Sequence, residues 1–205
     1  MEFFVKSGNP AKQRAGCVIA GVFARRKLSP AAKELDEACK GALSQAMRRG
    51  DIEGREGETV VLHGLSGLVC DRVLLVGLGR ERDFSDKAYI RATEEAVRAV
   101  RKTGAVDAVS YLTDLVVRKR DRRWTVLRAA MASGALGYRF VQCKSKPDPD
   151  HSKLNRITFN VPSRSDLAEA EEALRTATAL NAGMVLTRDL SNLPGNRCTP
   201  TDLAN

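Results

Sequence analysis

Histidine is scarce in this chain, and the scarcity limits the metal and acid–base chemistry that the sequence can carry. Only His63 and His151 occur, and no HExxH motif is present. Five cysteines are present without a CxxC pair, so a zinc site built from these residues is not expected. They are Cys17, Cys39, Cys70, Cys143 and Cys198. Because their number is odd, a complete disulfide set is impossible, and we expect free thiols in a reducing compartment.

Long apolar runs are also missing. No run approaches the roughly 20 residues that cross a bilayer, and the first residues lack the basic and apolar regions of a signal peptide. We therefore expect a soluble, cytoplasmic protein with no membrane partner. Aromatic residues are few, at 5%, but hydrophobic residues make up 43% and charged residues 29%, as in folded globular proteins. The 205 residues suit one domain, or one domain and part of a second.

Strand-like and helix-like segments alternate along most of the chain. Short apolar segments predict strands at 3–5, 16–23, 59–63, 72–76, 108–112 and 156–161. Helical spacing and capping residues predict helices from the cap Ser29 to Gly50, from Ser85 to Gly104, and over 124–138 and 165–190. This alternation indicates an α/β fold, with helices on both faces of a parallel or mixed sheet.

The same pattern predicts three parts of the chain. Residues 1–163 form the α/β domain, residues 164–190 form a long linker helix, and residues 191–205 begin a second domain. A turn is expected over 192–196, and Thr199-Pro200 restarts a helix with Thr199 as its cap. That helix has only begun at Asn205, which is typical of a boundary inside a longer protein.

No catalytic or metal-binding residue can be assigned from the motifs. Val76-Gly77-Leu78-Gly79 follows a strand, where free backbone amides bind anions. The dinucleotide fingerprint needs a further glycine three residues on, and Arg82 stands there instead. We interpret the segment as a turn at the end of a strand. Two histidines are too few for a convincing Ser–His–Asp triad.

The most unusual segment is basic. Residues 118–123 contain five cations and one acid: Arg118, Lys119, Arg120, Asp121, Arg122 and Arg123. The only tryptophan, Trp124, follows, and the net charge of the chain is +9. Such a cluster binds DNA phosphates, and residues 25–27 and 48–49 would extend it if the fold brings them together. The alternatives are a solvated charged surface and arginines that pair with a neighbouring subunit.

Several segments together resemble the leucyl aminopeptidase (cytosol aminopeptidase) family of bacteria. The resemblance begins with MEF, VKSG and KQR, and continues through LSP, MRRGDIEG, RVLLVGLG and FNVP. The most specific segment is RDLSNLPGN with Thr199-Pro200, which is similar to the family's entry into its catalytic domain. Gly195 departs from the pattern, because a second proline is usual at that position.

The resemblance implies a macro-domain-like N-terminal domain that a long helix joins to a C-terminal catalytic domain. In this family two divalent metal ions, zinc or manganese, activate a water that removes the N-terminal amino acid from peptides. Their ligands lie beyond Asn205, so the fragment alone is expected to be inactive. The family's enzymes are homo-hexamers, and some members also bind duplex DNA, which agrees with the basic residues at 118–123.

Two other functions remain open. Macro-like folds elsewhere bind ADP-ribose at loops that follow strands, and Gly77 and Gly79 are the candidates for such a small-molecule site here. Alternatively, the domain is purely structural, and it spaces and regulates the catalytic units.

Overall fold

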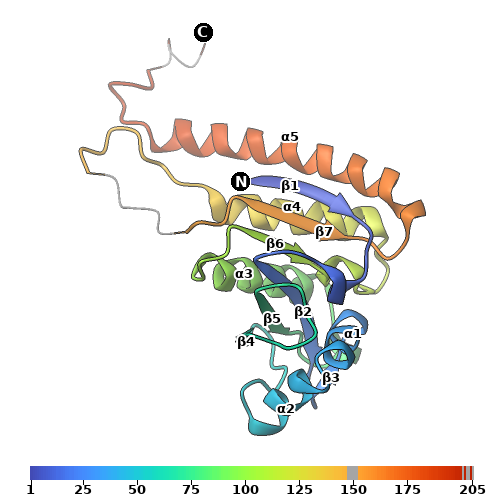
Figure 1. Cartoon of the computed structure of the whole chain (residues 1–205). Coiled ribbons are helices and arrows are strands. Elements are labelled where there is room, and N and C mark those ends of the chain that lie inside the picture. Colours follow the sequence, from blue (N-terminus) through green and yellow to red (C-terminus); the bar gives the residue numbers. More distant parts are fainter. Residues whose placement is uncertain (147–151, 200, 202–203, 205) are drawn as a thin grey trace.

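The computed structural model describes residues 1–146, 152–199, 201 and 204. One mixed sheet runs through the molecule in the order β1-β7-β6-β2-β5-β4 (Figure 1), and β3 pairs with the end of β2. The strands are β1 (Glu2–Lys6), β2 (Cys17–Phe23), β3 (Lys27–Leu28), β4 (Thr59–His63), β5 (Arg72–Gly77), β6 (Asp107–Ser110) and β7 (Arg156–Asn160). All neighbours are parallel except β4 with β5 and β3 with β2. The carboxyl ends of five strands therefore meet at one edge.

The sheet has an apolar core on each face, because the central strand β2 is apolar at every position. All seven residues of β2 are buried. Cys17 and Ile19 pack on one face, whereas Val18 and Ala20 pack on the other. The unbroken apolar run that predicted this strand thus reflects burial on both sides.

Helices cover both faces, as the alternating pattern predicted. The first layer contains α3 (Asp86–Arg101) and α4 (Arg122–Gly137), and the second contains α1 (Pro30–Ala38) and α2 (Ala42–Arg49). The single helix predicted from Ser29 to Gly50 is wrong, since α1 and α2 are separate. Lys40 and Gly41 adopt left-handed backbone angles, with φ of 55° and 84°, and these end one helix before the next begins.

The longest helix, α5 (Leu167–Asn192), lies along α4 and the edge strand β1 (Figure 1). Its amino-terminal half is anchored by three buried alanines, Ala170, Ala173 and Ala177. The predicted helix over 165–190 is therefore shifted by two residues, because a short 3-10 turn at Arg164–Asp166 precedes it. The predicted turn is found at 195–197. The predicted helix restart falls partly on Pro200, which lies outside the described residues.

Candidate nucleic-acid interface

The five cations predicted to bind DNA divide into two groups. Arg118 and Lys119 are exposed and line a groove of about 610 Å³ together with Arg82 and Lys87. Arg120 is also exposed and lines a smaller groove with Lys119 and Arg123, but its guanidinium pairs with Asp86 at the start of α3. Its guanidinium also lies 4.9 Å from the ring centroid of Trp124, in a cation–π contact.

The last two cations of the run are also engaged within the domain. Arg122 is half-buried and donates a hydrogen bond to the carbonyl oxygen of Thr113. Arg123 forms an ion pair of 2.7 Å with Glu172 of α5. Three of the five cations, Arg120, Arg122 and Arg123, thus hold the loop and α4 in place. The hydrogen bond from Arg120 lowers the pKa of the Asp86 carboxyl group.

Local packing explains why the loop exposes only part of the run. Leu115 and Val117 are buried in the core, and Val116 between them is 85% exposed. Asp121 then caps α4, since its carboxylate accepts a hydrogen bond of 2.8 Å from the backbone amide of Trp124. The loop is therefore held from both sides, with Arg118 and Lys119 at its exposed tip.

The basic residues at 25–27 lie at the same edge of the sheet. Arg25 and Arg26 lie in the turn between β2 and β3, and Lys27 begins β3. Arg25 and Lys27 line a groove of about 550 Å³ with Arg80, Glu81 and Arg82, whereas Arg26 is exposed beside it. Arg82 also lines the groove beside Arg118, so the two grooves adjoin. The prediction that residues 25–27 extend the patch agrees with this arrangement. Arg48 and Arg49 are exposed in the last turn of α2 and line none of these grooves.

The glycine loop after β5 has no free amide to offer an anion. The amides of Gly77, Leu78 and Gly79 donate to the carbonyl oxygens of Glu58, Val22 and Gly54. A Cβ atom at Gly77 would lie 1.8 Å from the carbonyl oxygen of Arg55. Close backbone packing therefore explains the glycine, as expected for a turn at the end of a strand.

A second pocket at this edge escaped the sequence analysis. It has a volume of about 490 Å³ and lies beside α1, where β1, β6 and β7 end. Asp114 lines it and accepts hydrogen bonds of 3.2 and 2.9 Å from the amide of Asn160. Burial raises the pKa of Asp114 to about 6. No signal in the sequence marks this carboxyl group, because its neighbours come from distant segments.

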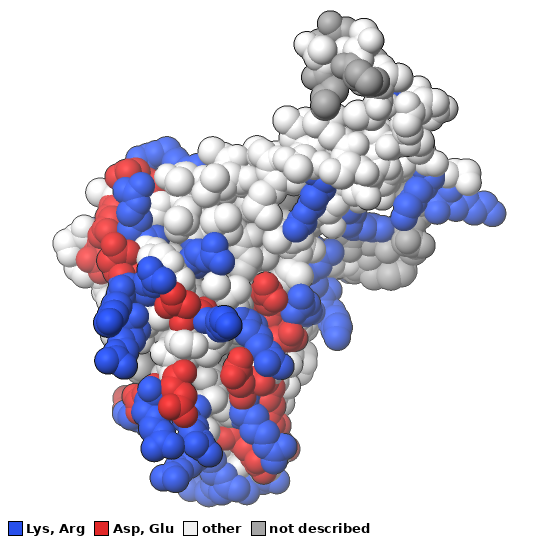
Figure 2. Space-filling model, turned by 180° about the vertical axis from the view of Figure 1, so that it is seen from behind, with Lys and Arg blue, Asp and Glu red and all other residues white. Residues whose placement is uncertain are grey.

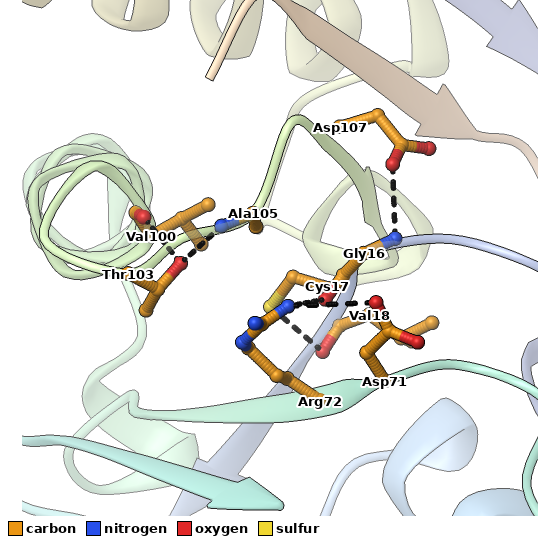
Figure 3. Close-up of polar contacts among 9 residues, drawn as sticks. All are labelled: Gly16, Cys17, Val18, Asp71, Arg72, Val100, Thr103, Ala105 and Asp107. Atoms are coloured by element: carbon orange, nitrogen blue, oxygen red, sulfur yellow. Dashed lines mark hydrogen bonds and ion pairs between the residues drawn. The ribbon is translucent and has the colours of Figure 1, made fainter. Parts of the chain in front are cut away.

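The cysteines and histidines form no reactive site in the described part of the chain. Cys17 lies beside a network at the amino ends of β2, β5 and β6 (Figure 3), where Arg72 donates to the carbonyl oxygen of Gly16 and Asp107 accepts from its amide. Burial raises the pKa of Cys17 to about 12 and also raises that of Cys70, so both are protonated thiols. All five cysteines are free. His151 lies outside the described residues.

These features define the class of the protein as a macrodomain-like α/β domain followed by a long helix. A macrodomain from Oceanobacillus iheyensis matches with a TM-score of 0.55 and 11% identity, over 86% of this chain and 92% of that chain. Tomato leucine aminopeptidase matches with a TM-score of 0.74 and 23% identity, over 100% of this chain and 40% of that chain. Both likenesses concern the fold, and they confirm the predicted fold class.

Sequence comparison identifies the family. The model of the cytosol aminopeptidase family, N-terminal domain, matches residues 19–147. The probable cytosol aminopeptidase of Thioalkalivibrio sulfidiphilus is 53% identical over 204 residues, which cover 100% of this chain and 41% of that protein. This chain belongs to the cytosol aminopeptidase family and corresponds to its N-terminal domain. It spans about two fifths of the length of that relative. The resemblance read from the sequence is thus confirmed.

Proposed function

We propose that this chain is the non-catalytic N-terminal domain of a metal-dependent leucyl aminopeptidase, which removes N-terminal amino acids from peptides in the cytoplasm. The observation that carries the proposal is the match of the family's N-terminal domain model to residues 19–147, combined with 53% identity to a relative over 100% of this chain and 41% of that relative's length. In the described part of the chain, no helix is long and apolar enough to span a membrane.

The metal chemistry belongs to the rest of the longer protein in this proposal. Among the described residues, no group of three or more His, Cys, Asp or Glu side chains lies together as metal ligands. The described residues therefore do not fit a pair of zinc or manganese ions. The proposed division is an α/β domain at 1–163, a linker helix at 164–190 and the start of the catalytic domain at 191–205.

The domain's own task is to support assembly and regulation of a homo-hexameric enzyme. The exposed carboxyl half of α5 supports this task. Leu180 and Leu186 there are 45% and 60% exposed, and residues 176–187 contain no charged side chain. A helix segment that is apolar on several sides is normally covered by other protein. We expect the catalytic domain to cover it.

DNA binding by the basic residues at 118–123 is a second proposed function. The adjoining grooves at the carboxyl edge of the sheet support it, because they hold Arg118 and Lys119 beside further cations. An ADP-ribose site at Gly77 and Gly79 gains no such support, since the loop amides are already hydrogen-bonded. A purely structural domain is the remaining alternative, in which neutralising residues 118–123 changes no DNA-related property.

A chimera tests the aminopeptidase proposal. This chain replaces the matching N-terminal portion of the Thioalkalivibrio sulfidiphilus protein, and hydrolysis of leucine p-nitroanilide is measured with added Mn²⁺. We expect an assembled and active chimera, whereas the isolated chain releases no product above a metal blank. Activity of the isolated chain, or a chimera that folds but neither assembles nor hydrolyses, would contradict the proposal.

A further inference from the structure

The basic surface that the fold builds differs from the basic run in the sequence. Three loops and the first turn of α3 contribute exposed cations at the carboxyl edge. The loops are residues 24–26 after β2, residues 78–85 after β5 and residues 111–121 after β6, and α3 contributes Lys87. We define the contact set as the exposed cations there for which no ion pair is found within the described residues. Its members are Arg25, Arg26, Arg80, Lys87, Arg118 and Lys119.

We infer that this contact set, and not the run 118–123 as a whole, is the surface that holds the phosphate backbone of duplex DNA. The inference rests on the DNA-binding function proposed above and names the residues that perform it. Arg120 and Arg122, which we call the anchored pair, then act as positioning residues for the loop, because their side chains bind Asp86 and Thr113.

The backbone at these positions is the strongest argument. Arg25 and Arg26 adopt φ values of 63° and 61°, and Lys119 adopts 60°. The left-handed region is unfavourable for side chains with a Cβ atom, and glycine or asparagine occupies it at lower cost. Three long basic side chains therefore occupy strained positions at one edge of the sheet. A sequence optimised for stability alone would carry glycine or asparagine there.

The shape of the surface favours an extended polyanion over a small phosphate ligand. The groove lined by Arg25 and Arg80 and the groove lined by Arg118 and Lys119 adjoin at Arg82. Their cations are distributed over three loops and the first turn of α3, and the loop amides at 77–79 cannot cradle a single phosphate group. Repeated phosphates along a nucleic-acid backbone match several separated cations.

The position of each cation should affect DNA affinity, because basic and acidic side chains are interspersed on the surface. On the face drawn in Figure 2, basic and acidic side chains alternate over the lower half of the molecule. Acids also neutralise part of the edge itself, as Lys27 pairs with Glu81. Binding by net charge alone would therefore respond equally to any two lost cations, whereas a defined contact set would not.

Three double variants, each losing two positive charges, test the inference. The contact variant is R25N/R26G, the anchored variant is R120Q/R122Q, and the remote variant is K102Q/K153Q. The remote residues are exposed and lie at the amino ends of β6 and β7, on the opposite edge of the sheet. Anisotropy with a labelled random duplex from about 50 to 200 mM salt gives affinity and its salt dependence. Thermal unfolding gives Tm.

We expect the contact variant to lose about tenfold in affinity at the lowest salt, with a salt slope shallower by about 2. Its Tm should equal or exceed that of the wild type, because two strained positions are relieved. The anchored variant should have a lower Tm than the wild type. Its affinity should stay within about threefold of that of the remote variant, which is the reference for the loss of two positive charges. R118Q/K119G, in the loop after β6, should show the same loss of affinity and the same change in salt slope.

Two results separate the failure of this inference from the failure of the proposed DNA binding. If the wild type shows no binding at 50 mM salt, the proposed DNA function fails, and the assignment of its residues fails with it. If the wild type binds but the contact variants bind as tightly as the remote variant, only the assignment is overturned. An anchored variant with normal Tm and a tenfold loss of affinity overturns it as well.

Discussion

Asp114 is a carboxyl group whose surroundings come from several distant segments. Asn160 at the end of β7 donates to both of its oxygens, while Glu34 of α1 and Asp166 before α5 are negative charges near it. Arg122 opposes them with a positive charge. Burial is the largest influence and raises the pKa of Asp114 from 3.8 to about 6. The charged form is therefore unfavourable in the folded protein.

Asp114→Asn should stabilise the domain at neutral pH. A raised folded-state pKa means that the folded protein binds the proton more tightly than the unfolded chain. The contribution of Asp114 to stability is then fully present below about pH 4 and is lost as pH rises through 6. The loss is at most about 3 kcal/mol, from a shift of about two pKa units. We expect Tm of the variant at pH 7.5 to exceed that of the wild type, with a weaker decline from pH 4.5 to 8.

Asp51→Asn provides the matched control, because Asp51 is exposed in the loop after α2. Its Tm profile should follow that of the wild type across the same pH range. If Asp114→Asn leaves the decline unchanged, Asp114 does not titrate near pH 6 in the folded protein. A decline that disappears in both variants would point to a general effect of lost negative charge.

At the scale of elements, apolar pattern and capping residues predicted most of the fold. The buried strands β2 and β5 were found because their apolar runs are continuous, and α1 and α3 begin at Ser29 and Ser85 as their caps indicated. The break between α1 and α2 was missed because the apolar residues keep helical spacing across it. Backbone angles at Lys40 and Gly41 decide that break, and only Gly41 marks it in the sequence.

The candidate site was less predictable than the fold. The basic run was visible, but its ion-pair partners were not, because Asp86 lies 34 residues from Arg120 and Glu172 lies 49 residues from Arg123. Sequence spacing gives no account of such contacts. The approach of residues 25–27 to Arg82 likewise depends on β2 and β5 being neighbours in the sheet.

At the amino end of α4, substitutions of Asp121 can separate the effect of its negative charge from the effect of its capping hydrogen bond. Asp121 caps the helix through the amide of Trp124 and is also the only acid in the basic run. Asp121→Ala should lower the free energy of unfolding by about 1 kcal/mol, as loss of a cap does. Asp121→Asn should stay close to the wild type, because its side-chain oxygen accepts the same bond. Urea unfolding of both variants measures the difference.

Both substitutions remove the same negative charge, so both should increase affinity for duplex DNA by a similar factor. Equal destabilisation of the two variants would mean that the charge beside the positive end of the helix, not the hydrogen bond, stabilises α4. A gain in affinity for Asp121→Ala alone would mean that loop mobility controls binding.

At the scale of the whole molecule, charged and apolar surfaces are separated. The charged side chains lie mostly over the sheet and its shorter helices, and the carboxyl half of α5 carries few of them (Figure 2). The helix packs against α4 and β1, and in its carboxyl half Asn181 and Arg188 donate hydrogen bonds to carbonyl oxygens of α4. Its carboxyl half exposes Leu180, Val185 and Leu186. Under the proposed function, the catalytic part of the longer protein covers this half, and the chain matches only 41% of its relative's length.

Acidic substitutions on this half of α5 should therefore affect assembly but not folding of the domain. In the chimera described above, L180E/L186E is expected to prevent stable docking, which reduces the oligomer and its peptidase activity. The isolated chain with the same changes should keep its Tm within about 2 °C, since both side chains are exposed.

The control is V69E/V106E, at positions that are 52% and 50% exposed but lie outside α5. Size-exclusion chromatography with light scattering measures the oligomer. If both chimeras assemble equally well, the apolar half of α5 is not the docking surface, and another face of the domain must contact the catalytic part.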